Sequence, residues 1–358
     1  MALRKWESTE RWDIKEEEDL LHLLIAINNN TDTTQYLYFS KESLMINHDF
    51  ANNFQKALGN NRYLKKLKVV GIQSGGTIAI FEALKVNSTL KTLDLAYNKL
   101  GIQGALSIAE ALLVNTTLTS LDLSYNNIKK EGGIAIANAL KVTSSLTTLN
   151  LDFNCIGSEG AIAIAEALRV NPSLKSLSLA KNSIFDNGLI AIADALKRQE
   201  PNVSSLEILN LNRNQMYSEA AKSMAILLKE NATLKSLSLR CNQIVNKGMI
   251  AILEALRENS TLTLLDLGES EIEYLRGSGE LSEVLSDVLL INSSLTSLNL
   301  DGIQIGDMGA LAIANVLKVN STLLRLNLRN TGIEKQGVIA MAESFRFNFT
   351  LSEIIVDK

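Results

Sequence analysis

Leucine recurs along this chain at an interval of 28 residues. The pattern L-x-x-L-x-L-x-x-N-x-[LI] begins at Leu90, Leu118, Leu146 and Leu174, and after four extra residues it begins again at Leu206 and Leu234. The apolar triplet alone continues from Leu262, Leu295, Leu323 and Leu351. A fixed period of this length indicates stacked units, because no single unit can bury its apolar face alone. We therefore expect a solenoid of about 10–12 repeats.

Each repeat has two halves with different hydrophobic periods. Leu93 and Leu95 flank Asp94, which is the alternation of a short strand with one buried face. Residues 104–112 place small and branched apolar side chains at helical spacing. Strand, loop, helix and return form a right-handed βα unit, so successive strands should be parallel. Strands stack more closely than helices, so this α/β array should curve into a horseshoe with strands on the concave face and helices on the convex face.

Asparagine recurs at two places in the repeat. The first set follows each strand, where an amide can bond the backbone of neighbouring turns and form a ladder: Asn98, Asn126, Asn154, Asn182, Asn214 and Asn242. The second set lies in N-x-[ST] triplets that resemble glycosylation sites: Asn87, Asn115, Asn231, Asn259, Asn292, Asn320 and Asn348. We interpret this set as turn residues between helix and strand, because Asn and Ser/Thr satisfy turn backbones.

The combined pattern L-[DN]-L-x-x-N-x-I-x-x-x-G-x-x-A-I-A-x-A-L spans residues 121–140 and 149–168. It resembles the ribonuclease-inhibitor-like class of leucine-rich repeat proteins, and the resemblance covers about residues 64–358. Similar repeats occur in the sensing arms of NOD-like receptors, the GTPase-activating protein for Ran, ciliary scaffolds and bacterial effectors. The resemblance implies a parallel-stranded horseshoe that binds another protein, and it does not identify the partner.

The two ends and two internal positions depart from the repeat. Residues 1–60 are predicted to be divergent, mainly helical N-terminal capping repeats, with the array proper over residues 61–358. Within the cap, we expect a helix opening at Asp13, a degenerate strand at 36–39 and a helix at 50–58, against which Trp6 and Trp12 pack. Extra residues at 198–202 and 273–279 are either neutral insertions or contact loops.

Composition narrows the function classes. The 358 residues include 35 Lys+Arg and 39 Asp+Glu, a formal net charge of −4, so general nucleic-acid binding is not expected. Cys155 and Cys241 are three repeats apart, too far for a disulfide in a stacked array, and they favour a reducing compartment. From the sequence we expect neither a membrane-spanning segment nor a secretory leader. We expect a cytoplasmic protein, and a host-directed effector stays open.

Side chains between and after the strand leucines should line the concave face. The residue before the ladder asparagine is Tyr97, Tyr125 or Phe153 in three consecutive repeats, near Asp94, Asp122 and Asp152. Aromatic side chains flanked by charge are typical of protein interfaces. Later repeats supply cations, which suggests a second, basic half: Lys181, Arg213, Arg240, Arg325 and Arg329. These eleven residues are the predicted partner-binding surface. The alternative for the aromatic residues is that they only stack on one another.

Catalytic chemistry is not expected. The chain has only two histidines, His22 and His48, so neither a metal site nor a nucleophile–His–acid arrangement is predicted. We therefore predict a non-catalytic scaffold or recognition module without a cofactor. Two alternatives remain: a GTPase-activating protein resembling the Ran activator, and a microbial effector that binds a host protein. We expect a monomer, with self-association possible through the open edge of the last strand near Leu351–Val356.

Overall fold

The computed structural model describes residues 26, 36–40, 48–71, 74–197, 204–270 and 279–357. The chain divides into two compact units, residues 1–182 (unit 1) and 183–358 (unit 2). Several predictions fall outside the described residues: the packing of Trp6 and Trp12, the helix opening at Asp13, the insertion at 198–202 and the insertion at 273–279 except its last residue.

Unit 1 alternates strands and helices from the first described strand onward. Its strands are β1 (Tyr36–Ser40), β2 (Lys66–Val70), β3 (Thr92–Asp94), β4 (Ser120–Asp122), β5 (Thr148–Asn150) and β6 (Ser176–Ser178). Its helices are α2 (His48–Asn60), α3 (Ser74–Leu84), α4 (Gly101–Val114), α5 (Lys129–Leu140) and α6 (Gly157–Leu168). β1 and α2 agree with the strand and the helix expected near residues 36–39 and 50–58; the predicted boundary between cap and array at residue 60 stays a prediction.

Unit 2 has the same alternation. Its strands are β7 (Ile208–Asn210), β8 (Ser236–Ser238), β9 (Leu264–Asp266), β10 (Ser297–Asn299), β11 (Arg325–Asn327) and β12 (Glu353–Ile355). Its helices are α7 (Phe185–Leu196), α8 (Ser218–Glu230), α9 (Asn246–Ala255), α10 (Gly279–Ile291), α11 (Gly306–Leu317) and α12 (Lys335–Ser344).

Strands within each unit pair in chain order and in parallel. In unit 1, Leu93 of β3 aligns with Leu67 of β2 and with Leu121 of β4; in unit 2, Leu298 of β10 aligns with Leu265 and Leu326. All six of these leucines are buried. The periodic leucines therefore form continuous internal columns, which confirms the predicted α/β repeat architecture.

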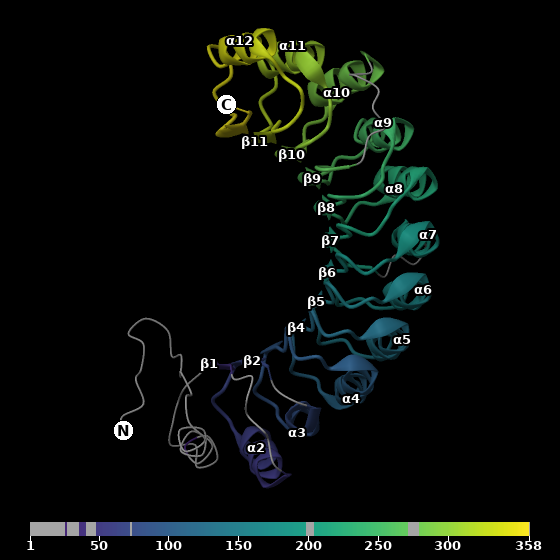
Figure 1. The fold of residues 1–358 in the computed structure, drawn as a ribbon, viewed down its shortest axis with the longest axis vertical. Helices are drawn as coiled ribbons and strands as arrows, with labels where there is room; N and C mark the ends of the chain where they lie inside the picture. Colours follow the sequence, from purple (N-terminus) through teal and green to yellow (C-terminus); the bar gives the residue numbers. More distant parts are fainter. Residues whose placement is uncertain are drawn as a thin grey trace. The chain divides into compact units, whose positions relative to one another are not determined.

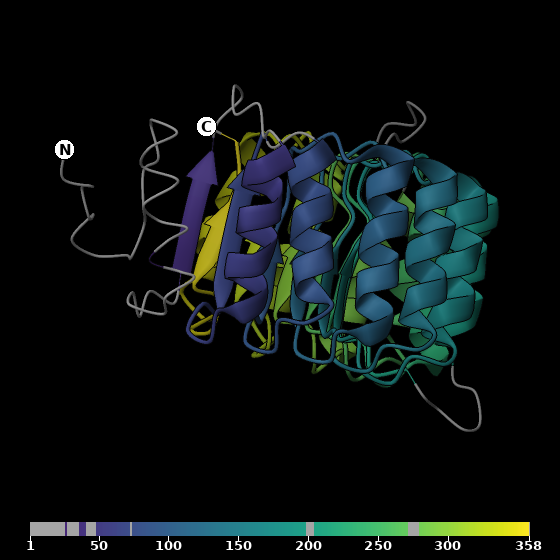
Figure 2. The same ribbon diagram turned by 90° about the horizontal axis from the view of Figure 1, so that it is seen from below.

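Helices cover the opposite side of each sheet. In α4, Ala105, Ile108 and Leu112 are fully buried, as the helical spacing predicted. Figure 1 shows each unit as an arc with its strands on the inner side and its helices on the outer side, and Figure 2 shows the helices of unit 1 side by side in chain order. A strand spacing of about 4.8 Å against a helix spacing of about 8–10 Å produces this curvature.

A glycine near the start of several helices, including α5 and α6, is close-packed against the preceding turn. A Cβ added at Gly160 in α6 would lie 2.4 Å from Cγ2 of Ile156, in the turn that leads into the helix. Gly132 in α5 meets Ile128 in the same way, at 2.5 Å. In α5 and α6, the absence of a side chain at this position lets the first helical turn lie against its own loop.

A buried asparagine ladder joins the turns that follow the strands. The Asn126 side chain accepts the backbone N–H of Asn98 at 2.9 Å and donates to the carbonyls of Leu95 and Leu123 at 2.8 and 2.9 Å. Unit 2 repeats the contact between Asn214 and Asn242. This prediction is confirmed. Where the asparagine is lost, the hydroxyls of Ser270 and Thr331 each donate to a carbonyl three residues earlier.

A second asparagine ladder joins the turns that follow the helices. The Asn115 side chain donates to the carbonyls of Leu84 and Asn87, and it accepts the N–H groups of Thr117 and Leu118. Only 5% of Asn115 is exposed. The N-x-[ST] triplets are therefore turn residues whose amides are buried and hydrogen-bonded, as the sequence indicated.

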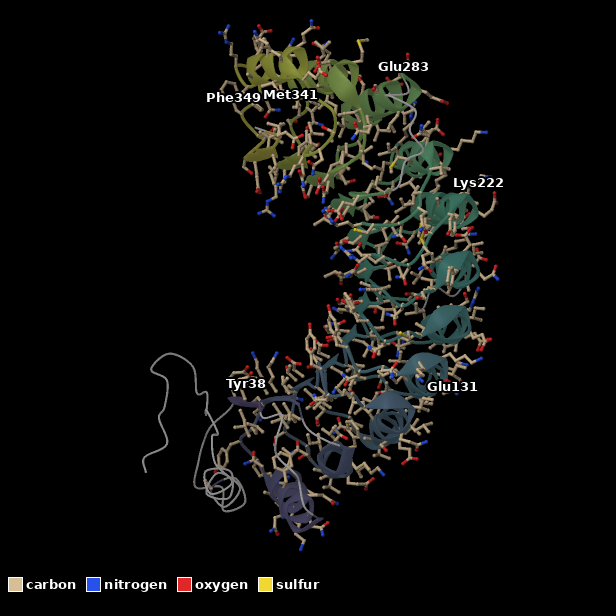
Figure 3. The ribbon with its side chains drawn as sticks, viewed as in Figure 1. Tyr38, Glu131, Lys222, Glu283, Met341 and Phe349 are labelled. Atoms are coloured by element: carbon tan, nitrogen blue, oxygen red, sulfur yellow. The ribbon has the colours of Figure 1, made fainter. Side chains whose placement is uncertain are left out.

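The last strand differs from the others in burial. Among the described residues, β12 pairs only with β11. Leu351, Ile354 and Val356 are partly exposed, whereas the matching leucines of the preceding repeat are buried. Phe349, labelled in Figure 3, is 91% exposed. Self-association through this edge stays a prediction.

Asn126→Ala should destabilise unit 1 by about 2–4 kcal/mol, because it leaves buried N–H and C=O groups without partners. Hydrogen exchange should show the first loss of protection at the amides of Asn98 and Leu100, which donate to the Asn126 side chain. Asn138→Ala, at an exposed site on α5, is the matched control and should be neutral. Equal effects of the two substitutions would contradict the ladder.

Candidate partner-binding surface on the strand side

The residue before each ladder asparagine adopts an uncommon backbone conformation. Tyr97, Tyr125, Phe153 and Lys181 have φ values of 63°, 58°, 58° and 53° in unit 1. Positive φ is costly for residues with a side chain and persists only where the surroundings enforce it. Here the neighbouring repeat does so: the N–H of Tyr97 bonds the Ser124 carbonyl at 3.0 Å.

The sequence analysis did not predict positive φ for the residue before each ladder asparagine, although the sequence contains a signal for it. The same position is occupied by Gly71 in unit 1 and by Gly302 and Asn330 in unit 2, all with positive φ. Glycine and asparagine are the residues that adopt this conformation most readily. Their appearance at this one position of the repeat indicates a left-handed backbone at the same position in the other repeats.

The three aromatic side chains form one continuous stack. The ring centroids of Tyr97 and Tyr125 are 4.1 Å apart with an interplanar angle of 13°, and those of Tyr125 and Phe153 are 4.0 Å apart at 17°. The Nζ atom of Lys181 lies 4.6 Å from the centroid of the Phe153 ring, a cation–π contact that covers the end of the stack. The three rings therefore stack on one another, and their contact with a partner stays a prediction.

Stacking leaves much of the aromatic surface exposed. Tyr97 is 55% exposed and Tyr125 is 37% exposed. In Figure 3, Tyr38 on β1 lies on the same strand side of unit 1, whereas Glu131 lies on the helix side. The stack is thus a rigid, solvent-facing aromatic surface, a feature typical of interaction sites.

The aspartates near the stack are bonded within the protein. Asp94 accepts the Lys68 ammonium at 2.5 Å and the N–H of Ala96 at 3.1 Å. The hydrogen bond to Asp94 raises the pKa of Lys68 above its ordinary value. Asp122 accepts the side-chain amide of Asn150 at 3.0 Å.

Asp152 is half-buried. It accepts the hydroxyl of Ser178 at 2.6 Å and the N–H of Ala180 at 2.7 Å. Burial and, to a lesser extent, the charge of Asp122 raise the pKa of Asp152, although its hydrogen bonds oppose the shift. These carboxylates shape the surface and give it negative charge.

In unit 2, Arg240 is committed to an internal ion-pair network. Its Nη2 atom lies 2.6 Å from Glu269 and 2.7 Å from Asp301. Arg240 reaches Asp301, two repeats away, because Gly268 leaves the space between them open: a Cβ at Gly268 would lie 2.8 Å from Nη1 of Arg240. Burial opposes the charged form, yet the bonds to Asp301 and Glu269 raise the pKa of Arg240.

The predicted basic character of this stretch therefore needs correction. Arg240 is neutralised by two carboxylates, and Arg325 lies 3.4 Å from Glu353. Arg213 and Arg329 are exposed side chains of unit 2, and Lys181 is an exposed side chain of unit 1. Comparing one position across successive repeats showed which residue types line this surface, but not how Arg240 pairs across repeats. That pairing is possible because Gly268 has no side chain.

The described residues also bear on metal binding, membrane insertion and disulfide formation. They contain no group of three or more His, Cys, Asp or Glu side chains placed to hold a metal ion. None of the described helices has the length and apolar character needed to cross a membrane. Cys155 and Cys241 are free thiols.

Comparison with known families agrees with this geometry. The family described as "Leucine Rich repeat" matches residues 86–109, 114–137, 143–165, 170–193, 230–253, 292–314 and 319–342. This chain is a leucine-rich repeat protein. No curated protein sequence matches it.

Solved structures resemble this leucine-rich repeat protein at low sequence identity, and the two with TM-scores above 0.5 share its fold. An internalin from Listeria monocytogenes is 18% identical over 98% of this chain and 88% of its own, with a TM-score of 0.51. Yeast Rad7, in a complex with Elc1, is 17% identical over 94% of this chain and 81% of its own, with a TM-score of 0.54. The actin-binding site 2 of leiomodin-1 is 22% identical over 53% and 88% of the two chains, with a TM-score of 0.32.

The positive φ of the residue before the ladder asparagine predicts that a glycine variant is more stable than an alanine variant at this position. Because φ at position 125 is 58°, Tyr125→Gly should be more stable than Tyr125→Ala by about 1 kcal/mol in urea unfolding. At Asn138, in the last turn of helix α5, the order should be reversed, with alanine favoured over glycine by up to about 1 kcal/mol. Alanine being favoured at both sites would contradict the assigned backbone.

The Arg240 network predicts a pH dependence. Burial alone would raise the pKa of Asp301, but the hydrogen bonds from Arg240 and Asn330 hold it below its ordinary value of 3.8. A carboxylate with a lowered folded-state pKa stabilises the fold above its unfolded-state pKa, and this contribution is lost as the pH falls. The stability difference between the natural chain and Asp301→Asn should therefore shrink between about pH 5 and pH 2.

Gly268→Ala should give a similar pH-dependent loss, because the new Cβ displaces the Arg240 guanidinium. Asp287→Asn, which breaks an exposed pair with Arg257, is the control and should show little effect. A difference that stays constant with pH for Asp301→Asn would be inconsistent with the network. Unfolding followed by circular dichroism at each pH provides the measurement.

Proposed function

We propose that this leucine-rich repeat protein is a non-catalytic recognition module that binds a partner protein on the strand side. The observation that carries the proposal is the exposed stack of Tyr97, Tyr125 and Phe153 in unit 1. Rigid aromatic side chains bind with little loss of conformational entropy, and they dominate the energy of protein interfaces.

The construction of the stack supports this function over a purely structural role. The stabilising core of the repeats is built mainly from buried leucine, isoleucine and alanine, and Tyr97 and Tyr125 lie outside it. An aromatic stack that served stability alone would be expected inside the core, where burial contributes most. Its solvent-facing position instead favours a surface reserved for a partner.

We further propose that the repeats belong to the ribonuclease-inhibitor-like class, because every complete repeat described here carries a full α-helix of 10 to 14 residues after its strand. Arg213 and Arg329 of unit 2, and Lys181 beside the stack, are proposed as additional contacts. Yeast Rad7, similar in fold, is itself found in a complex with another protein.

A photo-cross-linking amino acid, p-benzoyl-phenylalanine, tests the location of binding. Placed at position 97 it retains an aromatic ring on the strand side, and placed at position 113 it lies on the outer side of α4, where Leu113 is 51% exposed. In the source cells, position 97 should cross-link to a defined protein and position 113 should not. Cross-linking from position 113 alone, or from neither site, would argue against the proposal.

The cross-linked protein then serves as the ligand for affinity measurements by calorimetry. Tyr97→Ala and Tyr125→Ala should each weaken binding by at least about 1–2 kcal/mol. Both variants should keep the helical circular dichroism of the natural chain, because neither ring belongs to the buried core. Unchanged affinity in both variants would show that the stack is not part of the interface.

A further inference from the structure

Two strands of unit 1 begin at a group of lysine side chains that lies apart from the aromatic stack. Lys66 is the first residue of β2, Lys65 directly precedes it, and Lys91 directly precedes β3. The N–H of Lys91 donates to the Lys65 carbonyl at 2.8 Å, so these two lysines are neighbours in adjacent repeats. Lys65 is half-buried, whereas Lys66 and Lys91 are exposed. We call these three residues the lysine cluster.

The lysine cluster is not neutralised within the protein. In the part of the chain that the structure describes, no ion pair joins any of its three ammonium groups to a carboxylate. Asp94, which lies on β3 after Lys91, is bound by Lys68. Like charges placed opposite each other on neighbouring strands are destabilising. The cluster therefore costs the protein stability, which favours a role in binding over a role in the fold.

The same position of the repeat holds an ion pair in unit 2. Glu207 directly precedes β7, and Lys235 directly precedes β8. The backbone contact is the same as in the lysine cluster, because the N–H of Lys235 donates to the Glu207 carbonyl at 2.8 Å. The Nζ atom of Lys235 lies 2.7 Å from the Glu207 carboxylate. Side chains at this position therefore reach each other across one repeat, and a lysine here binds a carboxylate.

The group that matches the lysine cluster is thus a carboxylate supplied by another protein. One carboxylate placed between Lys65 and Lys91 accepts hydrogen bonds from both ammonium groups and removes their repulsion, as Glu207 does for Lys235. A second carboxylate is matched by Lys66, the next residue along the chain. Two acidic residues close together in a partner would fit this arrangement.

The surroundings of the lysine cluster do not suit a nucleic acid. The position that Lys91 takes becomes threonine in the next two repeats, at Thr119 and Thr147, whose hydroxyls bond the backbone. The cations therefore do not continue along unit 1, although a polynucleotide backbone needs a continuous series of them. The rest of the strand side carries carboxylates, among them Asp122 and Asp152, and these repel a polyanion.

One partner protein can contact both the lysine cluster and the aromatic stack. Tyr97 follows Lys91 by six residues, a span of at most about 22 Å, and a standard interface of about 800 Å² per partner is wide enough to include both. The register aligns Lys68 with Tyr38, and Figure 3 shows Tyr38 on the strand side of unit 1. Lys66, two residues before Lys68 on β2, therefore also lies on the strand side.

We propose that the lysine cluster binds an acidic segment of the partner protein, with one carboxylate between Lys65 and Lys91 and a second at Lys66. This inference rests on the proposed function and adds the chemistry of a second contact region. The partner places Asp or Glu side chains at the start of the strands and contacts the aromatic stack beyond their end.

The test uses the full chain and two fluorescent blocked peptides, one of sequence Gly-Glu-Gly-Glu-Gly-Glu-Gly and one with glutamine in place of glutamate. Fluorescence anisotropy should show saturable binding of the glutamate peptide that weakens as salt is added. The glutamine peptide, which is equally long but uncharged, should need at least about tenfold more protein. Absence of saturable binding, equal responses to the two peptides, or tighter binding of an oligothymidylate of about twelve nucleotides would overturn the inference.

Lys65→Glu is the matched blocking variant, because it reproduces the order of charges seen at Glu207 and Lys235. It should weaken binding of the glutamate peptide by at least about tenfold, and it should unfold at the same or a higher urea concentration than the natural chain, because a repulsion becomes an attraction. Lys247→Glu, at an exposed site on α9, changes the net charge equally and should alter binding by less than about twofold. Equal losses in the two variants, or no loss in Lys65→Glu, would overturn the inference.

Lys91→Thr is a second variant that the fold should tolerate, because the next repeat has Thr119 at the same position. It should weaken binding of the glutamate peptide by at least about threefold, through loss of one of the paired ammonium groups. If Lys65→Glu is less stable than the natural chain, Lys91→Thr decides the question, and an unchanged affinity in this variant would overturn the inference.

The two proposals fail in different ways. Cross-linking from position 97 without binding of the glutamate peptide would leave the partner-binding function standing and remove the acidic contact. Peptide binding without any cross-linked protein would remove the partner-binding function, and the inference would fall with it. Where both succeed, Lys65→Glu should also weaken binding of the cross-linked protein, and equal affinity of that protein for the natural chain and the variant would overturn the inference.

Discussion

Hydrogen bonding between adjacent repeats is the constraint on which the rest of this structure depends. In most of the described repeats, two turns would bury unpaired backbone groups, and an asparagine from the next repeat satisfies them, as Asn126 does for the turn at Asn98. A buried polar group without a partner costs about 1–3 kcal/mol. The ladders therefore fix the spacing between repeats, and this spacing brings side chains one period apart into contact on the strand side.

Much of the fold could be predicted from the sequence, because its determinants are periodic. The alternation at Leu93 and Leu95 predicted a strand, the spacing of Ala105, Ile108 and Leu112 predicted a helix, and Asn126 predicted a ladder; each depends only on residue type and period. The left-handed backbone before the ladder asparagine was missed, because tyrosine and phenylalanine give no local signal for positive φ. It is enforced by bonds to the next repeat.

The candidate site was predicted in part, for a related reason. Periodicity showed that Tyr97, Tyr125 and Phe153 are neighbours, and the structure adds that their rings stack. Periodicity could not show that Arg240 is paired with Asp301, because that contact crosses a repeat and needs the open space at Gly268. A glycine on the strand side can thus matter as much as a side chain does, since Gly268 decides which neighbour Arg240 reaches.

The central claim is that residues one repeat apart form a single stacked, exposed surface. A double-mutant cycle on unfolding, with Tyr97→Leu, Tyr125→Leu and the double variant, tests it most directly, because leucine retains apolar volume but removes the ring. The account predicts a coupling free energy of about 0.5–1.5 kcal/mol, as expected for stacked aromatic pairs. Additive effects, with a coupling below about 0.3 kcal/mol, would contradict it.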